Sequence, residues 1–274
     1  MGKIFTENDI EILISTMNQK NLDFLFPMFP LKHFSNYNIL IINQSKSTTL
    51  SSEFPSVRII NSEDIGLSRS RNLALENAVG KICIIADDDI VYHEEFLIRI
   101  SNAYNKFPDS AIINFCAVNA EGKLMKKYPL RTKNNLNFFD ILNATSFEMT
   151  FNKKVLDASN VRFDENFGLG GVFEMGEEAA FLIDLRKKNR QLVFEPSVIV
   201  LHAELTSSNK KSRIESYYIN GALFTRIFKI NYIFWIVTKL FFDLKQNKIG
   251  LRNIKTVIKS ANRGHKDYQR IKNK

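Results

Sequence analysis

The stretch ICIIADDDIVY (residues 82–92) places three adjacent aspartates directly after an apolar run. A short run of this kind, rich in isoleucine and without alternation, is typical of a strand buried on both faces of a sheet. Similar runs are IEILIS (10–15), YNILII (37–42), VRII (57–60) and AIINFCAV (111–118), and a helical pattern, LSRSRNLALENA (67–78), lies among them. We therefore predict an α/β fold with a mostly parallel central sheet flanked by helices and with ligands at the carboxyl ends of its strands.

The second half of the chain is less regular. The basic segment KLMKKYPLRTKNN (123–135) has the composition of a loop. It could be either a lid over the substrate or a solvent-exposed connection. A strand entering a helix is expected at 146–156, a helix at 179–189, a strand at 197–201, and helices from about residue 214 to the end. The last helices would form an extension to the α/β domain.

Composition and cysteine content indicate a globular intracellular protein. The chain has 274 residues, of which 45% are hydrophobic and 24% charged. Its two cysteines, Cys83 and Cys116, lie in apolar runs, so we expect buried reduced thiols. The N-terminus lacks the pattern of a signal peptide, and the most hydrophobic window (232–242) is too short to cross a bilayer, which takes about 20 residues. These features predict a cytoplasmic location.

The net charge of +9 is concentrated at one end. Residues 245–274 contain ten lysines or arginines and one acidic residue, which leaves equal numbers of basic and acidic residues elsewhere. Apolar residues recur there at helical spacing among the basic ones: Leu251, Ile254, Val257, Ile258 and Ala261. Such a basic amphipathic helix is expected to contact the inner face of a cell membrane or to pack on the protein's own body. Nucleic-acid binding is not expected, because the rest of the chain is neutral.

The negative charge of the three aspartates has to be neutralised by a cation, because adjacent carboxylates at a strand end repel one another. A divalent cation such as Mg²⁺ or Mn²⁺ takes oxygen ligands and is commonly shared between carboxylates and substrate phosphates. In extended geometry Asp87 and Asp89 would point to one face and Asp88 to the other. Arg69 and Arg71, at the start of the preceding helix, are suited to meeting a phosphate group.

Taken in order, these segments resemble the family 2 glycosyltransferases of the GT-A fold. The resemblance covers roughly residues 10–205 and rests on six motifs: ILISTMNQ (12–19), NILIINQS (38–45), GLSRSRN (66–72), IADDD (85–89), FDENFGLGGVFEMGEE (163–178) and VIVLHAE (198–204). It implies a nucleotide-sugar-dependent domain over residues 1–205 and a helical extension with a basic amphipathic tail over 206–274. Each motif alone is weak evidence for the family, whereas the six motifs in this order are a specific signature of it.

The resemblance implies a nucleotide-sugar site. Thr16 would contact the base or ribose, and Arg71 would hold the nucleotide or the acidic loop. Asp87 and Asp89 match the two ends of a D-x-D motif, of which the first would bind the ribose or sugar and the second the metal, and Asp88 between them would also belong to the nucleotide-sugar site. Asn43 stands where the family commonly has an aspartate that grips the base, so the identity of the base stays open.

The resemblance also implies the metal and the catalytic groups. Asp89 and His202 would ligate Mn²⁺ or Mg²⁺. Glu178 occupies the position of the family's catalytic base, where aspartate is common, and Glu177 precedes it.

These roles imply an inverting transfer. Gly170 and Gly171 would let the backbone approach the donor sugar. With one base and direct displacement, an α-linked nucleotide donor would give a β-linked product. The acceptor would be a saccharide, lipid-linked if the tail binds membrane, in bacterial surface polysaccharide synthesis such as that of capsule. A nucleotidyltransferase and a non-catalytic binding protein of polysaccharide assembly are the alternatives.

Overall fold

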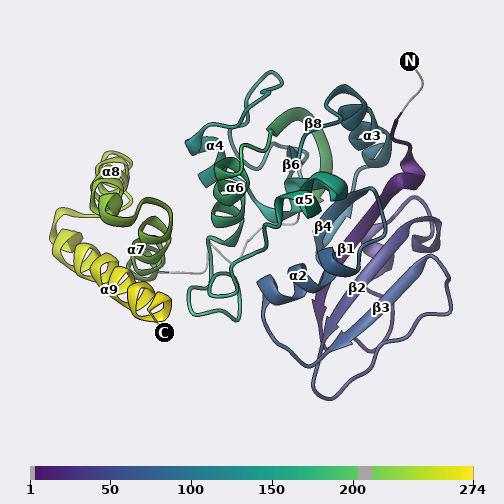
Figure 1. Cartoon of the computed structure of the whole chain (residues 1–274), viewed down its shortest axis with the longest axis horizontal. Helices are drawn as coiled ribbons and strands as arrows, with labels where there is room; N and C mark the ends of the chain where they lie inside the picture. The colour runs from purple at the N-terminus through teal and green to yellow at the C-terminus, as the bar shows by residue number, and fades with distance from the viewer. Residues whose placement is uncertain (1–3, 203–211, 274) are drawn as a thin grey trace.

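A computed structural model of the chain describes residues 4–202 and 212–273. Its centre is an eight-stranded sheet with the order β3-β2-β1-β4-β7-β6-β8-β5 (Figure 1). The strands are β1 (Ile10–Met17), β2 (Asn38–Gln44), β3 (Val57–Ser62), β4 (Ile82–Asp87), β5 (Ile90–Tyr92), β6 (Ile112–Val118), β7 (Met149–Asn152) and β8 (Leu192–His202).

The first half of the sheet is parallel, as predicted from the apolar runs. β3, β2, β1 and β4 pair in parallel, and the register places Ser15 opposite Asp87 and Thr16 opposite Asn43. The polar residues that follow each apolar run therefore gather at one edge. The second half is mixed, because β7 runs antiparallel to both β4 and β6, and the short β5 runs antiparallel to β8.

Helices cover both faces of the sheet, which explains why its strands are apolar throughout. On β1, Leu13 belongs to one buried cluster, whereas Ile12 and Ile14 belong to a second cluster on the other face. Ala74 of α2 packs into the first cluster and Ile100 of α3 into the second. The helices of this region are α1 (Leu25–Met28), α2 (Leu67–Asn77), α3 (Phe96–Lys106), α4 (Phe138–Leu142), α5 (Lys153–Ser159) and α6 (Glu177–Lys187).

The basic segment 123–135 is held to the sheet by a buried carboxylate. Glu148 accepts a hydrogen bond from the Tyr128 hydroxyl at 2.5 Å and forms an ion pair with Lys126 at 2.8 Å. Burial raises the pKa of Glu148, and Lys126 opposes that shift. Further along the segment, Lys133 and Phe194 of β8 exchange backbone hydrogen bonds. The segment is therefore an irregular connection with buried anchors.

Three helices form the C-terminal part: α7 (Arg213–Phe228), α8 (Tyr232–Lys245) and α9 (Ile254–Lys272). Short 3-10 segments join them at Lys229–Asn231 and Leu251–Asn253. Arg226 of α7 forms ion pairs of 2.6 Å with Asp164 and with Asp184 of α6, which attaches these helices to the α/β part. The domain boundary expected between residues 205 and 206 lies outside the described residues.

The apolar side of the basic tail packs on the protein itself. Val257 and Ala261 of α9 are buried against α7, which runs beside it (Figure 1). The two helices approach closely at glycines: a Cβ added to Gly221 would lie 1.9 Å from the Ala261 carbonyl oxygen, and one added to Gly264 would lie 1.8 Å from that of Tyr218. The alternative of packing on the protein's own body therefore accounts for Val257 and Ala261, whereas Ile258 and, before the helix, Leu251 are exposed. No described helix combines the length and the apolar character that a membrane crossing requires.

We predict that Gly264→Ala destabilises the protein, because the added methyl group would meet backbone atoms of α7. The free energy of unfolding in a denaturant titration should fall by about 1–3 kcal/mol. Gly250→Ala is the matched control, since an added Cβ there has nothing within 4 Å. Equal stability of the two variants would contradict the close approach of α7 and α9.

Candidate functional site

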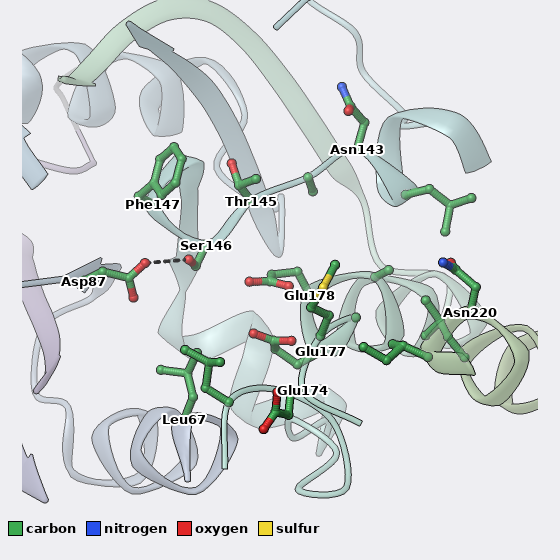
Figure 2. A pocket seen from close by; sticks show the side chains of 18 of the residues that line it. Leu67, Asp87, Asn143, Thr145, Ser146, Phe147, Glu174, Glu177, Glu178 and Asn220 are labelled. Carbon is green, nitrogen blue, oxygen red and sulfur yellow. Dashed lines mark hydrogen bonds between the residues drawn. The ribbon is translucent and has the colours of Figure 1, made fainter. Parts of the chain in front are cut away.

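A cavity of about 1010 Å³ opens at the carboxyl ends of β1 and β4. One part of its wall is polar and comes from these strand ends, α2 and the start of α6. The other part comes from α4, α7 and α8. It combines the apolar side chains of Phe139, Leu142, Leu223, Phe224, Trp235 and Phe242 with polar ones of Asn220, Thr238, Lys239 and Asp243. Figure 2 shows Asp87, Ser146, Glu177 and Glu178 projecting toward one another across the polar part.

Arg71 is the centre of the polar part. Its side chain projects from α2, is only 2% exposed, and lies 3.3 Å from the Asp87 carboxylate and 3.2 Å from each of the Glu177 and Glu178 carboxylates. Burial tends to lower the pKa of Arg71, but attraction to these carboxylates outweighs it, and the net shift is upward. One buried cation thus joins α2, β4 and α6.

The three aspartates diverge instead of pointing at one shared ligand. Asp87 also accepts a hydrogen bond from the Ser146 hydroxyl at 3.1 Å, and Asp88 accepts one from the Thr16 hydroxyl. Asp89 lies on the far side of the turn. The expectation that Asp87 and Asp89 share a face of an extended strand is wrong, because β4 ends at Asp87 and residues 88 and 89 form a turn before β5.

Asp89 and His202 are brought together by the pairing of β5 with β8. The His202 Nε2 atom lies 3.4 Å from an Asp89 carboxylate oxygen, and the buried imidazole stacks on Phe147. The hydrogen bond with His202 lowers the pKa of Asp89 against the effect of its partial burial. A carboxylate and an imidazole suit a divalent cation that takes its other ligands from phosphate and water. Within residues 4–202 and 212–273, no group of three or more His, Cys, Asp or Glu side chains is arranged to hold a metal.

Glu177 and Glu178 differ in environment although they are neighbours at the start of α6. Glu177 is buried, and among the residues that the structure describes its Oε2 atom has no hydrogen-bond partner. Burial and the adjacent Glu178 raise the pKa of Glu177 to about 8, with Arg71 acting in the opposite direction. Glu178 is more exposed than Glu177 and lines the cavity. The pair therefore offers one carboxyl group that retains its proton and one carboxylate within reach of a ligand.

The turn before α6 depends on a glycine. Gly176 has φ +96°, a conformation that side-chain-bearing residues rarely adopt, and an added Cβ would lie 3.0 Å from Leu223 of α7. Of the glycines singled out from the sequence, Gly170 lines the cavity and Gly171 is not among the residues that line it. Gly171 instead forms a tight turn, in which an added Cβ would lie 2.9 Å from the Asn166 carbonyl oxygen.

Asn43 does not line the cavity. It is fully buried, and its amide exchanges hydrogen bonds with the backbone of Gln19 at 3.1 and 3.3 Å and donates to Asn61 at 3.1 Å. Its neighbour Gln44 lines the cavity, as do Thr16 and the three aspartates. Sequence reasoning missed Ser146, because nothing in the pattern at 146–156 distinguishes a residue that contacts Asp87.

Comparison with known proteins gives one family match and several structural matches. The sequence model described as Glycosyl transferase family 2 matches residues 12–159. A crystal structure of S. aureus TarS 1–349 is 14% identical, covers 92% of this chain and 78% of its own, and has a TM-score of 0.58. The same fragment in complex with UDP-GlcNAc is also 14% identical. This match covers 92% of this chain and 79% of the TarS chain and has a TM-score of 0.59. A longer TarS structure, 13% identical with a TM-score of 0.54, matches over 80% of this chain and 40% of its own. At these identities the structural matches establish a shared fold. No curated protein matches.

We predict that Glu177 makes the stability of the protein fall with rising pH. The unfolded side chain ionises near pH 4.5, whereas the folded one keeps its proton up to about pH 8. The folded state therefore binds more protons between these values, and the contribution present below pH 4.5 is lost by about pH 8. Glu177→Gln removes this titration, so its melting temperature at pH 8 should exceed that of the wild type by roughly 10 °C, and the excess should shrink toward pH 5.

Glu94→Gln provides the control for this measurement, because Glu94 is exposed on the surface. Its melting temperature should follow that of the wild type at every pH. A constant difference between Glu177→Gln and the wild type from pH 5 to pH 8 would show that Glu177 is ionised throughout this range.

Proposed function

The chain belongs to glycosyl transferase family 2, and on this premise we propose that it transfers a sugar from a nucleoside diphosphate sugar to a hydroxyl group of a saccharide acceptor. The observation that carries the proposal is the Arg71 cluster, which places the acidic turn after β4 and the carboxylates of α6 in the wall of one cavity. Such a transfer needs a site that binds the departing diphosphate and a base that takes the acceptor's proton. The acidic turn after β4 would supply the first, and the carboxylates of α6 would supply the second. The family match favours this reaction over nucleotidyl transfer.

The donor would bind along the edge formed by β1 and β4. Thr16, Asp87 and Asp88 line the cavity there and are held by hydrogen bonds to one another or to neighbouring residues. S. aureus TarS, whose fold this chain shares, was crystallised with UDP-GlcNAc, which supports a nucleotide-sugar donor of this kind. Gln44 is a better candidate than Asn43 for contact with the base, since only Gln44 lines the cavity.

Asp89 and His202 would hold the divalent cation, Mn²⁺ or Mg²⁺. When bound, the cation supplies positive charge that stabilises the departing diphosphate. The chain's own residues prepare this position, because the β5–β8 pairing brings the carboxylate and the imidazole within 3.4 Å.

Glu178 would act as the general base. Both glutamates line the cavity, but Glu178 is the more exposed of the two, and Glu177 keeps its proton up to about pH 8. The protonated neighbour leaves Glu178 as the carboxylate that accepts the hydroxyl proton, and Arg71 fixes its position. With a single base, the attack is a direct displacement, so an α-linked donor gives a β-linked product.

The acceptor would lie against the wall formed by α7 and α8, so residues 1–205 would bind the donor and residues 206–274 the acceptor. The apolar side chains of that wall suit a lipid-linked saccharide. We place the reaction at the inner face of the cell membrane in bacterial surface polysaccharide synthesis, with the basic residues of 245–274 near the lipid headgroups.

We predict that Glu178→Gln lowers turnover by about 10²–10⁴-fold, because the amide cannot accept the acceptor's proton. The readout is sugar transfer, or slow hydrolysis of the donor, in a panel of nucleotide sugars with Mn²⁺. Glu174→Gln is the matched control, since Glu174 lines the same cavity four residues earlier. Near-normal turnover in Glu178→Gln, with the protein folded, would remove Glu178 from the base role.

We also predict that Asp89→Asn abolishes the rise in melting temperature that Mn²⁺ gives in the presence of a nucleoside diphosphate. The neutral amide oxygen is a weaker ligand for a hard divalent cation than the carboxylate is. The exposed Asp109 provides the control variant Asp109→Asn, which should respond as the wild type does. An unchanged manganese response in Asp89→Asn would place the metal elsewhere.

A further inference from the structure

α8 presents an exposed stripe of apolar side chains. The stripe comprises Ile230, which lies in the 3-10 segment before the helix, and Ile233, Phe234, Val237 and Phe241 of the helix itself, and we call it the outer face of α8. These residues recur at intervals of three and four, which places them on one side of a helix, and they are between 47% and 86% exposed. An exposed apolar stripe of this extent, with no charged residue at its positions, indicates a surface that is covered when the protein functions.

The adjoining side of α8 lines the cavity. Trp235 and Phe242 belong to the cavity wall. Each contacts a ring of the outer face edge-on: Phe234 and Trp235 have ring centroids 5.6 Å apart, and Phe241 and Phe242 have theirs 5.7 Å apart. A ligand that covers the outer face therefore lies one side chain away from the cavity.

Cations lie at both ends of the outer face. Lys229 precedes α8, Lys245 ends it and Lys248 follows it, and all three are exposed. Further exposed cations follow at Arg252 and Lys255. Among the residues that the structure describes, none of these five pairs with a carboxylate. An apolar stripe with free cations at its ends complements an anionic phospholipid surface, where acyl chains lie beneath a layer of phosphate groups.

A second copy of the chain fits the outer face poorly. Two copies related by a two-fold axis perpendicular to α8 would pair their helices antiparallel, which brings Lys229 of one copy against Lys245 and Lys248 of the other. Because both ends of α8 are cationic, a parallel arrangement also juxtaposes like charges. Anionic lipid removes this repulsion.

We propose that the outer face of α8 inserts into the boundary between headgroups and acyl chains of an anionic bilayer, with the helix lying in the plane of the membrane. At 14 residues, α8 is too short to cross the bilayer. Figure 1 shows α8 at the edge of the molecule, away from the sheet, where it is accessible to a surface. The insertion places the apolar side chains of the cavity wall beside the membrane. That this placement presents a lipid-linked acceptor to the cavity rests on the proposed function. Val257 and Ala261 of α9 cannot serve this purpose, because they are buried against α7.

Trp235 is the only tryptophan of the chain and reports on α8 directly. The experiment mixes the full chain with phosphatidylglycerol vesicles whose acyl chains carry bromine, without donor or metal. Insertion of the outer face should quench the Trp235 emission. Val237→Asp puts a charge at the centre of the face and should lower partitioning into the vesicles about tenfold, and Phe241→Ser should lower it in the same direction. The control is Val79→Asp, a site that is 74% exposed and lies on the α/β part, where partitioning should not change.

Melting temperatures of the variants identify any that fail to fold, and sedimentation of the free protein identifies self-association. Vesicle binding without quenching, unchanged binding of both α8 variants, or a dimer that Val237→Asp dissociates would each overturn the proposal. The vesicle assay contains no sugar nucleotide, so its result does not depend on whether the protein turns over a donor. Conversely, a lack of membrane insertion would refute this proposal without refuting the proposed sugar transfer.

Discussion

The site depends on one buried cation that is shared among three carboxylates. The Arg71 guanidinium reaches Asp87 after β4 and both glutamates at the start of α6, so it fixes the distance between two elements that are about 90 residues apart in the chain. Burial, and then repulsion from Glu178, raises the pKa of Glu177 against the opposing effect of Arg71, so the most buried of the three carboxyl groups keeps its proton. Loss of Arg71 would leave buried carboxylates unpaired, which in other buried ion pairs costs about 3–5 kcal/mol.

The sheet supplies the frame for this cluster, and glycines let the remaining elements close around it. The parallel register sets Ser15 beside Asp87, and the hydroxyl of Ser15 contacts that of Ser70 on α2 at 2.7 Å. The glycine-rich segment then packs on the start of α2: an added Cβ on Gly170 would lie 3.0 Å from the Gly66 Cα. Larger residues at this contact would push the segment away from α2, and α6 with its glutamates follows that segment directly.

The parallel half of the sheet could be predicted from the sequence because burial on both faces leaves a direct signal, an uninterrupted apolar run. β5 and β7 are three and four residues long, and their antiparallel pairing depends on partners far along the chain, so no local pattern indicates them. The same limit applies to the site. Asp87, Glu177 and Glu178 stand out by charge and position, whereas the different roles of Asn43 and Gln44 depend on which face of β2 meets the cavity. Periodicity also could not distinguish α9, whose apolar side meets α7, from α8, whose outer face meets solvent.

The contrast between the two parts of the cavity wall bears on the chemistry. In sugar transfer, water competes with the acceptor hydroxyl for the activated donor, so the region next to the base has to exclude water. The aromatic and aliphatic side chains of α7 and α8 supply apolar surface to the cavity wall, beside polar residues of the same helices such as Asn220 and Lys239. The apolar side chains of this wall continue, through the paired rings of α8, to the apolar outer face of that helix. An amphipathic acceptor would satisfy both surfaces at once, with its lipid outside and its hydroxyl group near Glu178, and its binding would itself complete the exclusion of water.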